Sequence, residues 1–145
     1  MPASTTIYPE WNLALVRYSD YLLTIETAQN FEKYLNHRDF RTHHRCLFDL
    51  NRVTGAQMDL VKMRELQKYR MQKIAPNGDP VRLVLFAQTD FGCTFARLIA
   101  KTWEPSGAEI SIVEDSEAAA LALLEIPLDD FAALSQQRNR PTAAG

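Results

Sequence analysis

Apolar positions along the chain fall into short runs of strand length that alternate with stretches of helical spacing. Strands are predicted at residues 5–8, 12–18, 45–53, 81–87 and 109–113. Pro9 ends the first strand because proline has no amide hydrogen to donate to a ladder, and Ser19-Asp20 punctuates the second. Both faces of the second run are largely apolar, which is typical of a strand covered on both sides.

A helical pattern follows each of the last four predicted strands. The helices are expected to begin at Thr24, Asp59, Thr89-Asp90 and Asp115-Ser116, whose side chains can accept hydrogen bonds from unpaired amides. The expected apolar faces are Ile25, Ala28, Phe31 and Leu35 in the first helix, Leu60, Met63, Leu66 and Ile74 in the second, and Phe91, Phe95, Leu98, Ile99 and Thr102 in the third. A short terminal helix is expected through Phe131 and Leu134.

Strands that alternate with helices indicate right-handed crossover units around a mainly parallel sheet. The expected fold class is α/β, with a four- to five-stranded, mostly parallel mixed sheet flanked by about four helices. Residues 1–134 are expected to form a single domain, and the polar segment 135–145 is expected to be a disordered tail.

Composition restricts the classes of function. The chain has 145 residues, 46% hydrophobic and 23% charged, with a net charge of -2, which favours neither nucleic acid nor an anionic membrane as partner. Cys46 and Cys93 lack the spacing of a zinc site or redox pair and are expected to be reduced, packed thiols. We expect a cytoplasmic protein, because no signal peptide and no transmembrane segment is evident.

A set of short motifs is distributed along the predicted elements. They are Tyr8-Pro9-Glu10, Val16-Arg17-Tyr18-Ser19, Phe48-Asp49-Leu50, Asp90-Phe91-Gly92, Ala96-Arg97, and Ile112-Val113-Glu114-Asp115 with Glu117-Ala118. In order and spacing the chain resembles the STAS/SpoIIAA-like superfamily over residues 5–124, in particular its stand-alone bacterial SpoIIAA-like proteins. The resemblance implies a small domain without catalysis that regulates partners by protein–protein contact. Some stand-alone relatives are thought to hold a hydrophobic ligand or to associate with membranes.

The chain departs from the anti-sigma-factor antagonists of that superfamily at their switch. Antagonists carry Asp-Ser-Ser-Gly before the second helix, and the matching stretch here is Gln57-Met58-Asp59-Leu60. Asp59 therefore stands where the resemblance would place a phosphorylated serine. A carboxylate imitates a phosphate only partly, so the phosphorylation switch is not expected here, and Asp59 is interpreted first as a helix N-cap.

The junction after the third predicted strand supplies the first candidate binding residues. Asp49 ends the buried run and is expected to have hydrogen-bond partners in the following loop, because an isolated buried carboxylate is costly. Thr54 and Gly55 are expected in that loop, where a hydroxyl and backbone amides would be offered to a ligand. A plain turn is the alternative for both.

The turn after the fourth predicted strand supplies the second set, at the same edge of the sheet. Thr89, Asp90, Phe91 and Gly92 open a helix whose amides could bind an anion, although Asp90 would repel one. Gly92 is expected to allow close packing of helix on sheet. Arg97 lies off the apolar face and is expected to pair with a carboxylate, with ligand binding as the alternative.

No catalytic or metal-binding set is evident in the sequence. His37, His43 and His44 are not expected to converge on a metal, and neither a nucleophile elbow nor a phosphate loop is present. The second helix carries basic residues that are interpreted as a solvated face or a patch for an acidic partner or lipid head group: Lys62, Arg64, Lys68, Arg70 and Lys73.

The leading hypothesis is a non-enzymatic regulatory module that acts by contact with an unidentified protein, without cofactor or metal. The alternative is a carrier or sensor of a small apolar ligand or lipid at a membrane surface. That alternative predicts an apolar pocket near Phe91, Phe95 and the second helix. A homodimer is left open.

Overall fold

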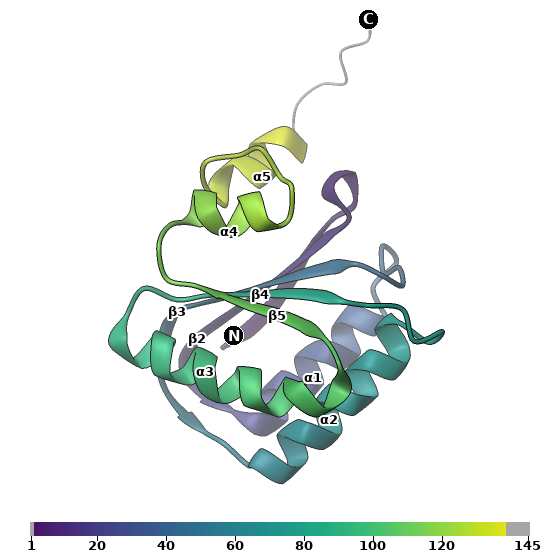
Figure 1. Cartoon of the computed structure of the whole chain (residues 1–145), viewed down its shortest axis with the longest axis vertical. Coiled ribbons are helices and arrows are strands. Elements are labelled where there is room, and N and C mark those ends of the chain that lie inside the picture. The colour runs from purple at the N-terminus through teal and green to yellow at the C-terminus, as the bar shows by residue number, and fades with distance from the viewer. Residues whose placement is uncertain (1, 139–145) are drawn as a thin grey trace, which may run out of the picture.

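The computed structural model describes residues 2–138 and contains one mixed β-sheet with helices on both faces (Figure 1). The strands are β1 (Ala3–Tyr8), β2 (Leu13–Leu23), β3 (Arg45–Gln57), β4 (Arg82–Phe86) and β5 (Glu109–Val113). The α-helices are α1 (Thr24–Leu35), α2 (Leu60–Ile74), α3 (Asp90–Trp103), α4 (Glu117–Leu123) and α5 (Ala132–Arg138). Two short 3-10 helices, η1 (Pro9–Trp11) and η2 (Glu104–Ser106), precede β2 and β5.

The five strands lie in the order β1-β2-β3-β4-β5. β1 pairs antiparallel with β2, and the other neighbours are parallel, so the predicted mixed, mostly parallel α/β sheet is confirmed. Each parallel strand is added on the same side of its predecessor. Because crossovers between parallel strands are right-handed, α1, α2 and α3 all lie on one face. α4 and α5 follow the last strand and cover the other face (Figure 1).

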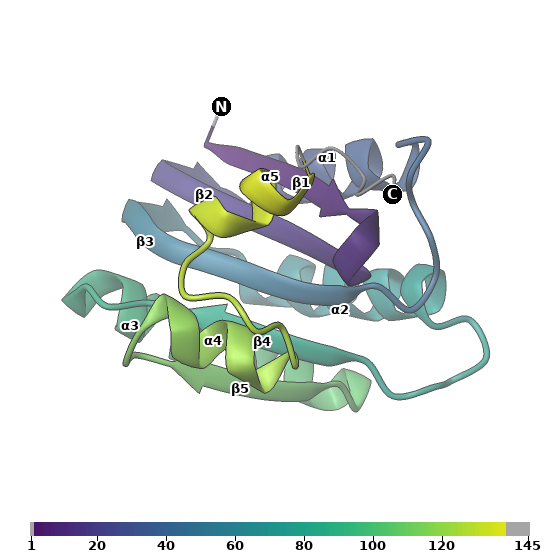
Figure 2. The same ribbon diagram turned by 90° about the horizontal axis from the view of Figure 1, so that it is seen from above.

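The sheet separates two hydrophobic cores, because neighbouring side chains on a strand point to opposite faces. Phe48 of β3 packs with Phe95 and Trp103 of α3 on the three-helix face. Leu47, its neighbour, packs with Leu121 of α4 on the other face. Figure 2 shows that α4 lies over the β4–β5 half of the sheet and α5 over the β1–β2 half.

β2 and β3 are longer than predicted. Ser19-Asp20 does not end β2; register shifts occur there, and Asp20 takes a left-handed backbone (φ 57°) that lets the strand continue to Leu23. β3 likewise continues to Gln57, whereas its partner β4 ends at Phe86, opposite Asp49. The ends of β2 and β3 therefore form a two-stranded ribbon that projects beyond the rest of the sheet.

The predicted apolar faces of the helices are wrong at their first turns. Ile25 is 58% exposed, and Leu60 and Phe91 are each 38% exposed. Polar side chains occupy part of the buried faces instead and are satisfied internally. Thr27 donates to the Thr24 carbonyl at 2.7 Å, and the Asn30 amide donates to Thr5 Oγ1 at 2.9 Å.

The C-terminal boundary also differs from the prediction. Residues 135–138 belong to α5, so the segment expected to be disordered begins inside a helix. The expectation for 139–145 lies outside the described residues. Within 2–138, no helix has the length and apolarity needed to cross a membrane.

Candidate functional site

The starts of α1, α2 and α3 meet at the edge where the parallel strands end. Asp59 is the N-cap of α2 and its Oδ1 accepts from the Lys62 amide at 3.1 Å. Thr89 is the N-cap of α3 and its Oγ1 accepts from the Gly92 amide at 3.0 Å. Both predicted caps are confirmed, so these two side chains are engaged in the protein's own backbone.

Thr24 has a different role from the one predicted. Leu23 holds the N-cap position of α1, and Thr24 is its first residue. The Thr24 hydroxyl donates to the Gln57 carbonyl at 3.0 Å and accepts from the Asp59 amide at 3.1 Å. One buried hydroxyl therefore ties the start of α1 to the start of α2.

Thr54 and Gly55 lie in β3, not in a loop, which corrects the prediction for both. Gly55 pairs with Tyr21, and a Cβ on Gly55 would lie 2.8 Å from Cδ2 of the Tyr21 ring. Glycine at this position lets the Tyr21 ring lie across the ribbon. Thr54 points to solvent.

Asp49 is separated from the other candidates. It alternates with Phe48 and Leu50, so its side chain lies on the face of α4 and α5, away from Asp59. Its Oδ1 accepts from the Asn51 amide at 3.1 Å, and its Oδ2 lies 3.9 Å from Nε of Arg17 on β2. The hydrogen-bond partner of Asp49 was expected in a following loop, but it is the amide of Asn51, which lies two residues later in β3.

The remaining charged candidates lie on the outside of α3. Arg97 pairs with Glu114 at 3.0 Å, as predicted, across the end of β5. Asp90 is exposed beside Phe91, whose ring stacks on Phe95 at 5.7 Å between centroids. Gly92 packs closely on the sheet as predicted, since a Cβ there would lie 3.0 Å from the Leu50 carbonyl oxygen.

The histidines and cysteines occupy separate places. His43 pairs with Asp79 at 2.8 Å, whereas the Nδ1 of buried His44 shares a hydrogen bond of 2.6 Å with the Tyr34 hydroxyl. Burial raises the pKa of the Cys46 thiol to about 12, and burial together with Glu114 raises that of Cys93. Both thiols are free, and no group of three metal-ligating side chains occurs among residues 2–138.

Large exposed apolar side chains occur on the end of β2 and in the first turns of α1, α2 and α3, which follow the carboxyl ends of parallel strands. The set, called here the apolar edge patch, consists of Tyr21, Leu23, Ile25, Leu60, Val61 and Phe91. Val61 is 64% exposed and Phe91 38% exposed. A groove of about 410 Å³ lies between α1 and α2 and is lined by two members of the patch, Leu23 and Ile25, with Leu66 and Lys62 among others. Sequence reasoning missed this patch because it assigned Ile25, Leu60 and Phe91 to the core.

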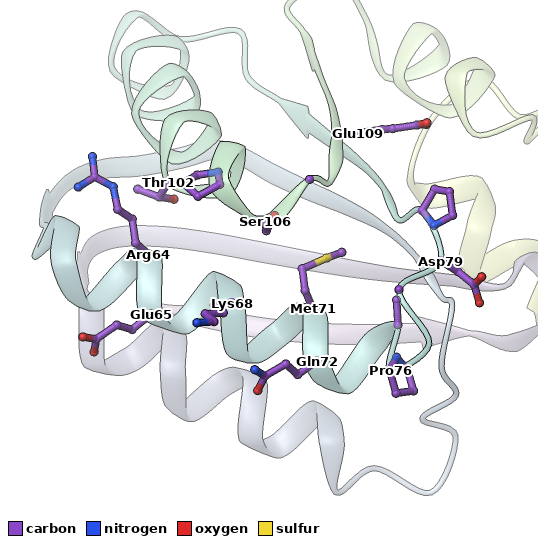
Figure 3. Close-up of a pocket in the computed structure, with 15 residues that line it drawn as sticks. Arg64, Glu65, Lys68, Met71, Gln72, Pro76, Asp79, Thr102, Ser106 and Glu109 are labelled. Atoms are coloured by element: carbon purple, nitrogen blue, oxygen red, sulfur yellow. The ribbon is translucent and has the colours of Figure 1, made fainter.

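A second groove, of about 910 Å³, lies at the opposite edge, where β4 and β5 begin (Figure 3). It lies between α2, the turn at 76–80 and η2, and its lining combines Met71 and three prolines with Arg64, Glu65 and Lys68. The only sequence signal for it was the proline-flanked turn. The groove brings the basic outer face of α2 into a concave surface.

Comparison with known proteins adds one likeness of fold. No protein-family model and no curated protein matches the chain. The chain is similar to the solved structure of an uncharacterized protein of the DUF3478 family from Shewanella loihica PV-4, described as having a SpoIIAA-like fold. Sequence identity is 15% and the TM-score 0.49, with 77% of this chain and 83% of the other covered. The description of that structure gives no ligand or activity.

Proposed function

We propose that this protein is a non-enzymatic binding module that recognises an acidic, amphipathic segment of another protein at the apolar edge patch. The observation that carries the proposal is the exposure of six large apolar side chains on the end of β2 and in the first turns of α1, α2 and α3. Apolar side chains that are exposed singly need no explanation, whereas Leu23 and Ile25 line one groove together with Leu66, and an apolar groove bordered by polar residues is typical of an interaction surface.

The shape of the patch supports a segment as the occupant. The groove of about 410 Å³ between α1 and α2 is open to solvent and has Leu23 and Ile25 on one wall and Leu66 on the other. An amphipathic helix or strand places side chains at regular spacing into such a groove. Rigid backbone on both sides, tied together by the Thr24 hydroxyl, keeps the groove preformed.

Charge supports an acidic occupant. The outer face of α2 carries exposed Lys62, Arg64, Lys68 and Lys73 against the single carboxylate of Glu65. The Lys73 ammonium also lies over the Tyr69 ring, 5.6 Å from its centroid. Lys62 lines the groove between α1 and α2, and Arg64 and Lys68 line the larger groove farther along the helix. Carboxylates that flank the apolar positions of a partner would meet this face and speed its association.

The volumes of the inner cavities favour surface recognition over carriage of an apolar ligand. The cavity beside Phe95, lined by Met58 and Met63, measures about 10 Å³. Binding sites for drug-sized molecules measure about 300–1,000 Å³. The small cavity volume between the helices and the sheet therefore fits a packed core better than a binding site for a carried apolar ligand.

We do not propose catalysis, because the candidate polar side chains cap helices or form ion pairs. Asp59 and Thr89 cap helices, Arg97 is paired with Glu114, and Asp49 lies on the opposite face. A nucleophile and base need mutual hydrogen-bond geometry beside a space for substrate.

The proposal is tested with a displayed library of random peptides, selected on the purified full chain. We expect enrichment of peptides with apolar residues at regular spacing next to Asp or Glu. Val61→Asp should weaken binding of a selected peptide about tenfold or more, as loss of an apolar anchor does. Lys62→Glu should reduce the salt dependence of the same binding. Dissociation constants are measured by isothermal titration calorimetry.

Leu123→Asp is the matched control, since Leu123 is an exposed apolar residue on α4 at the other face. It should leave peptide binding unchanged. Vesicles of phosphatidylcholine with phosphatidylserine form the second arm. Sedimentation with the vesicles but no peptide enrichment would show a lipid-binding surface and contradict the proposal, as would a selected peptide whose affinity is the same for Val61→Asp and wild type.

A further inference from the structure

Arg70 is a buried cation inside the three-helix core. Its side chain points inward from α2 and is 4% exposed, although it was predicted on the solvated face. Nη1 donates to Gln67 Oε1 at 2.6 Å and Nη2 donates to the Tyr18 hydroxyl at 3.3 Å. The guanidinium also lies over the rings of Phe31 and Trp103, at 5.4 and 5.7 Å from their centroids. All these neighbours are neutral.

No counter-charge accompanies this cation in the described part of the chain. No carboxylate of residues 2–138 lies within ion-pair distance of Arg70. The Cys46 thiol lies on the same cavity, but burial raises its pKa to about 12, so it is neutral at physiological pH. A buried charge without a compensating partner is costly.

A small cavity adjoins the guanidinium. It measures about 20 Å³ and is lined by Arg70 and Trp103 together with Asn30, Phe31 and Phe48 among others. Trp103 is fully buried, and its Nε1–H has no acceptor among the described residues. Arg70 has N–H donors to spare, and the Asn30 amide already donates to Thr5. The lining therefore has unused N–H donors and a positive charge, whereas its oxygens, from Thr5, Asn30 and Tyr34, are neutral and supply no counter-charge.

A chain of hydrogen bonds holds the Arg70 guanidinium in place. Gln67 Oε1 accepts from Arg70, and Gln67 Nε2 donates to Thr102 Oγ1 at 3.0 Å. The Thr102 hydroxyl donates in turn to the Ile99 carbonyl at 2.6 Å. The chain of hydrogen bonds anchors Arg70 to the backbone of α3, so its orientation toward the cavity is preorganised.

We propose that this cavity binds a single halide ion, chloride under physiological conditions, as the counter-ion of Arg70. A monatomic anion accepts hydrogen bonds from several directions, which suits the spare donors of Arg70 and the indole of Trp103. A volume of about 20 Å³ holds one atom-sized ligand, since one water needs roughly 10–15 Å³. Phosphate and carboxylate ligands are too large.

The direct test is the crystal structure of the full wild-type chain grown in bromide. Anomalous scattering should give a peak in the cavity, within contact distance of the Arg70 guanidinium. Anomalous density only at the surface, with a water oxygen or nothing in the cavity, would overturn the proposal.

A solution test uses thermal unfolding in sodium chloride and in sodium gluconate of equal ionic strength. The unfolding midpoint of the wild type should rise further in chloride than in gluconate, because a ligand that binds only the folded state stabilises it. Arg70→Met should remove the difference between the two salts. Arg64→Met, an exposed arginine of the same helix, should keep it.

Trp103→Phe provides a second variant should Arg70→Met fail to fold. It removes the unpaired N–H and keeps the cation, so the half-saturating chloride concentration should rise about tenfold. Equal midpoints for wild type in the two salts, or an unchanged chloride response in Trp103→Phe, would contradict the assigned site.

Discussion

Gly92→Ala tests how closely α3 packs on the sheet beside the apolar edge patch. Gly92 is the third residue of α3, directly after Phe91. A Cβ at this position would lie 2.7 Å from Thr89 Oγ1, 3.0 Å from the Leu50 carbonyl oxygen and 3.2 Å from Ala87 Cβ. The Leu50 oxygen belongs to the backbone of a buried strand and cannot move aside alone, so the helix start must shift.

The expected cost follows from three contributions. Overpacking of a rigid site costs about 1–3 kcal/mol, and displacement of the Thr89 capping hydroxyl adds about 1 kcal/mol. Alanine returns up to about 1 kcal/mol through its better helix propensity. We expect a net loss of about 2 kcal/mol in the free energy of unfolding, or about 4–8 °C in Tm for a chain of this size.

The assay is urea denaturation followed by circular dichroism, with Gly55→Ala as the matched control. A Cβ on Gly55 would lie 2.8 Å from the Tyr21 ring, which is formally as close. The Tyr21 side chain is 59% exposed and can turn outward, so Gly55→Ala should change the free energy of unfolding by no more than about 0.5 kcal/mol. Gly92→Ala at least as stable as wild type, or equal losses for both variants, would refute the reasoning from backbone contact.

Three further predictions concern single side chains. Asp59→Ala should lower the free energy of unfolding by about 1 kcal/mol, as measured in urea titrations. Asp59→Ser should change it little, because serine also caps a helix. Equal losses for the two variants would show that Asp59 does not act as a cap. Burial lowers the pKa of His44 from its ordinary 6.5, so the unfolded chain binds more protons below that pH. Stability should be full above about pH 6.5 and fall below it, and a His44→Asn variant with the same decline would exclude this origin. Cys46 should resist a thiol reagent that labels half-buried Cys93, because burial raises the pKa of the Cys46 thiol to about 12. Mass spectrometry of protein digests measures the two labelling rates. Equal rates would contradict the burial of Cys46.

The alternation of apolar runs was enough to predict the order of strands and helices and the class of sheet. The helix starts at Asp59, Thr89 and Ser116 were also predicted from sequence, and each side chain accepts the expected amide hydrogen bond. These features depend on residues a few positions apart, so they can be inferred without knowing which elements are neighbours.

The candidate site was predicted less well. Thr54 and Gly55 were expected in a loop because glycine is common in turns, but here Gly55 makes room for a ring on the neighbouring strand. Asp49 was expected at the junction that leads from the third strand to Asp59, whereas strand alternation puts it on the other face of the sheet. Helical spacing placed Ile25, Leu60 and Phe91 in the core, although all three are exposed in the fold.

By itself the sequence determined the α/β pattern, the helix caps at Asp59, Thr89 and Ser116, and the absence of familiar catalytic motifs, since these follow from backbone hydrogen bonding and local side-chain chemistry. Tertiary structure decided which apolar residues form the exposed edge patch and that Arg70 points into the core toward Tyr18 and Trp103. Burial is a property of what lies opposite a residue in space, and the partners of Arg70 come from strand and helix positions far from it in the chain.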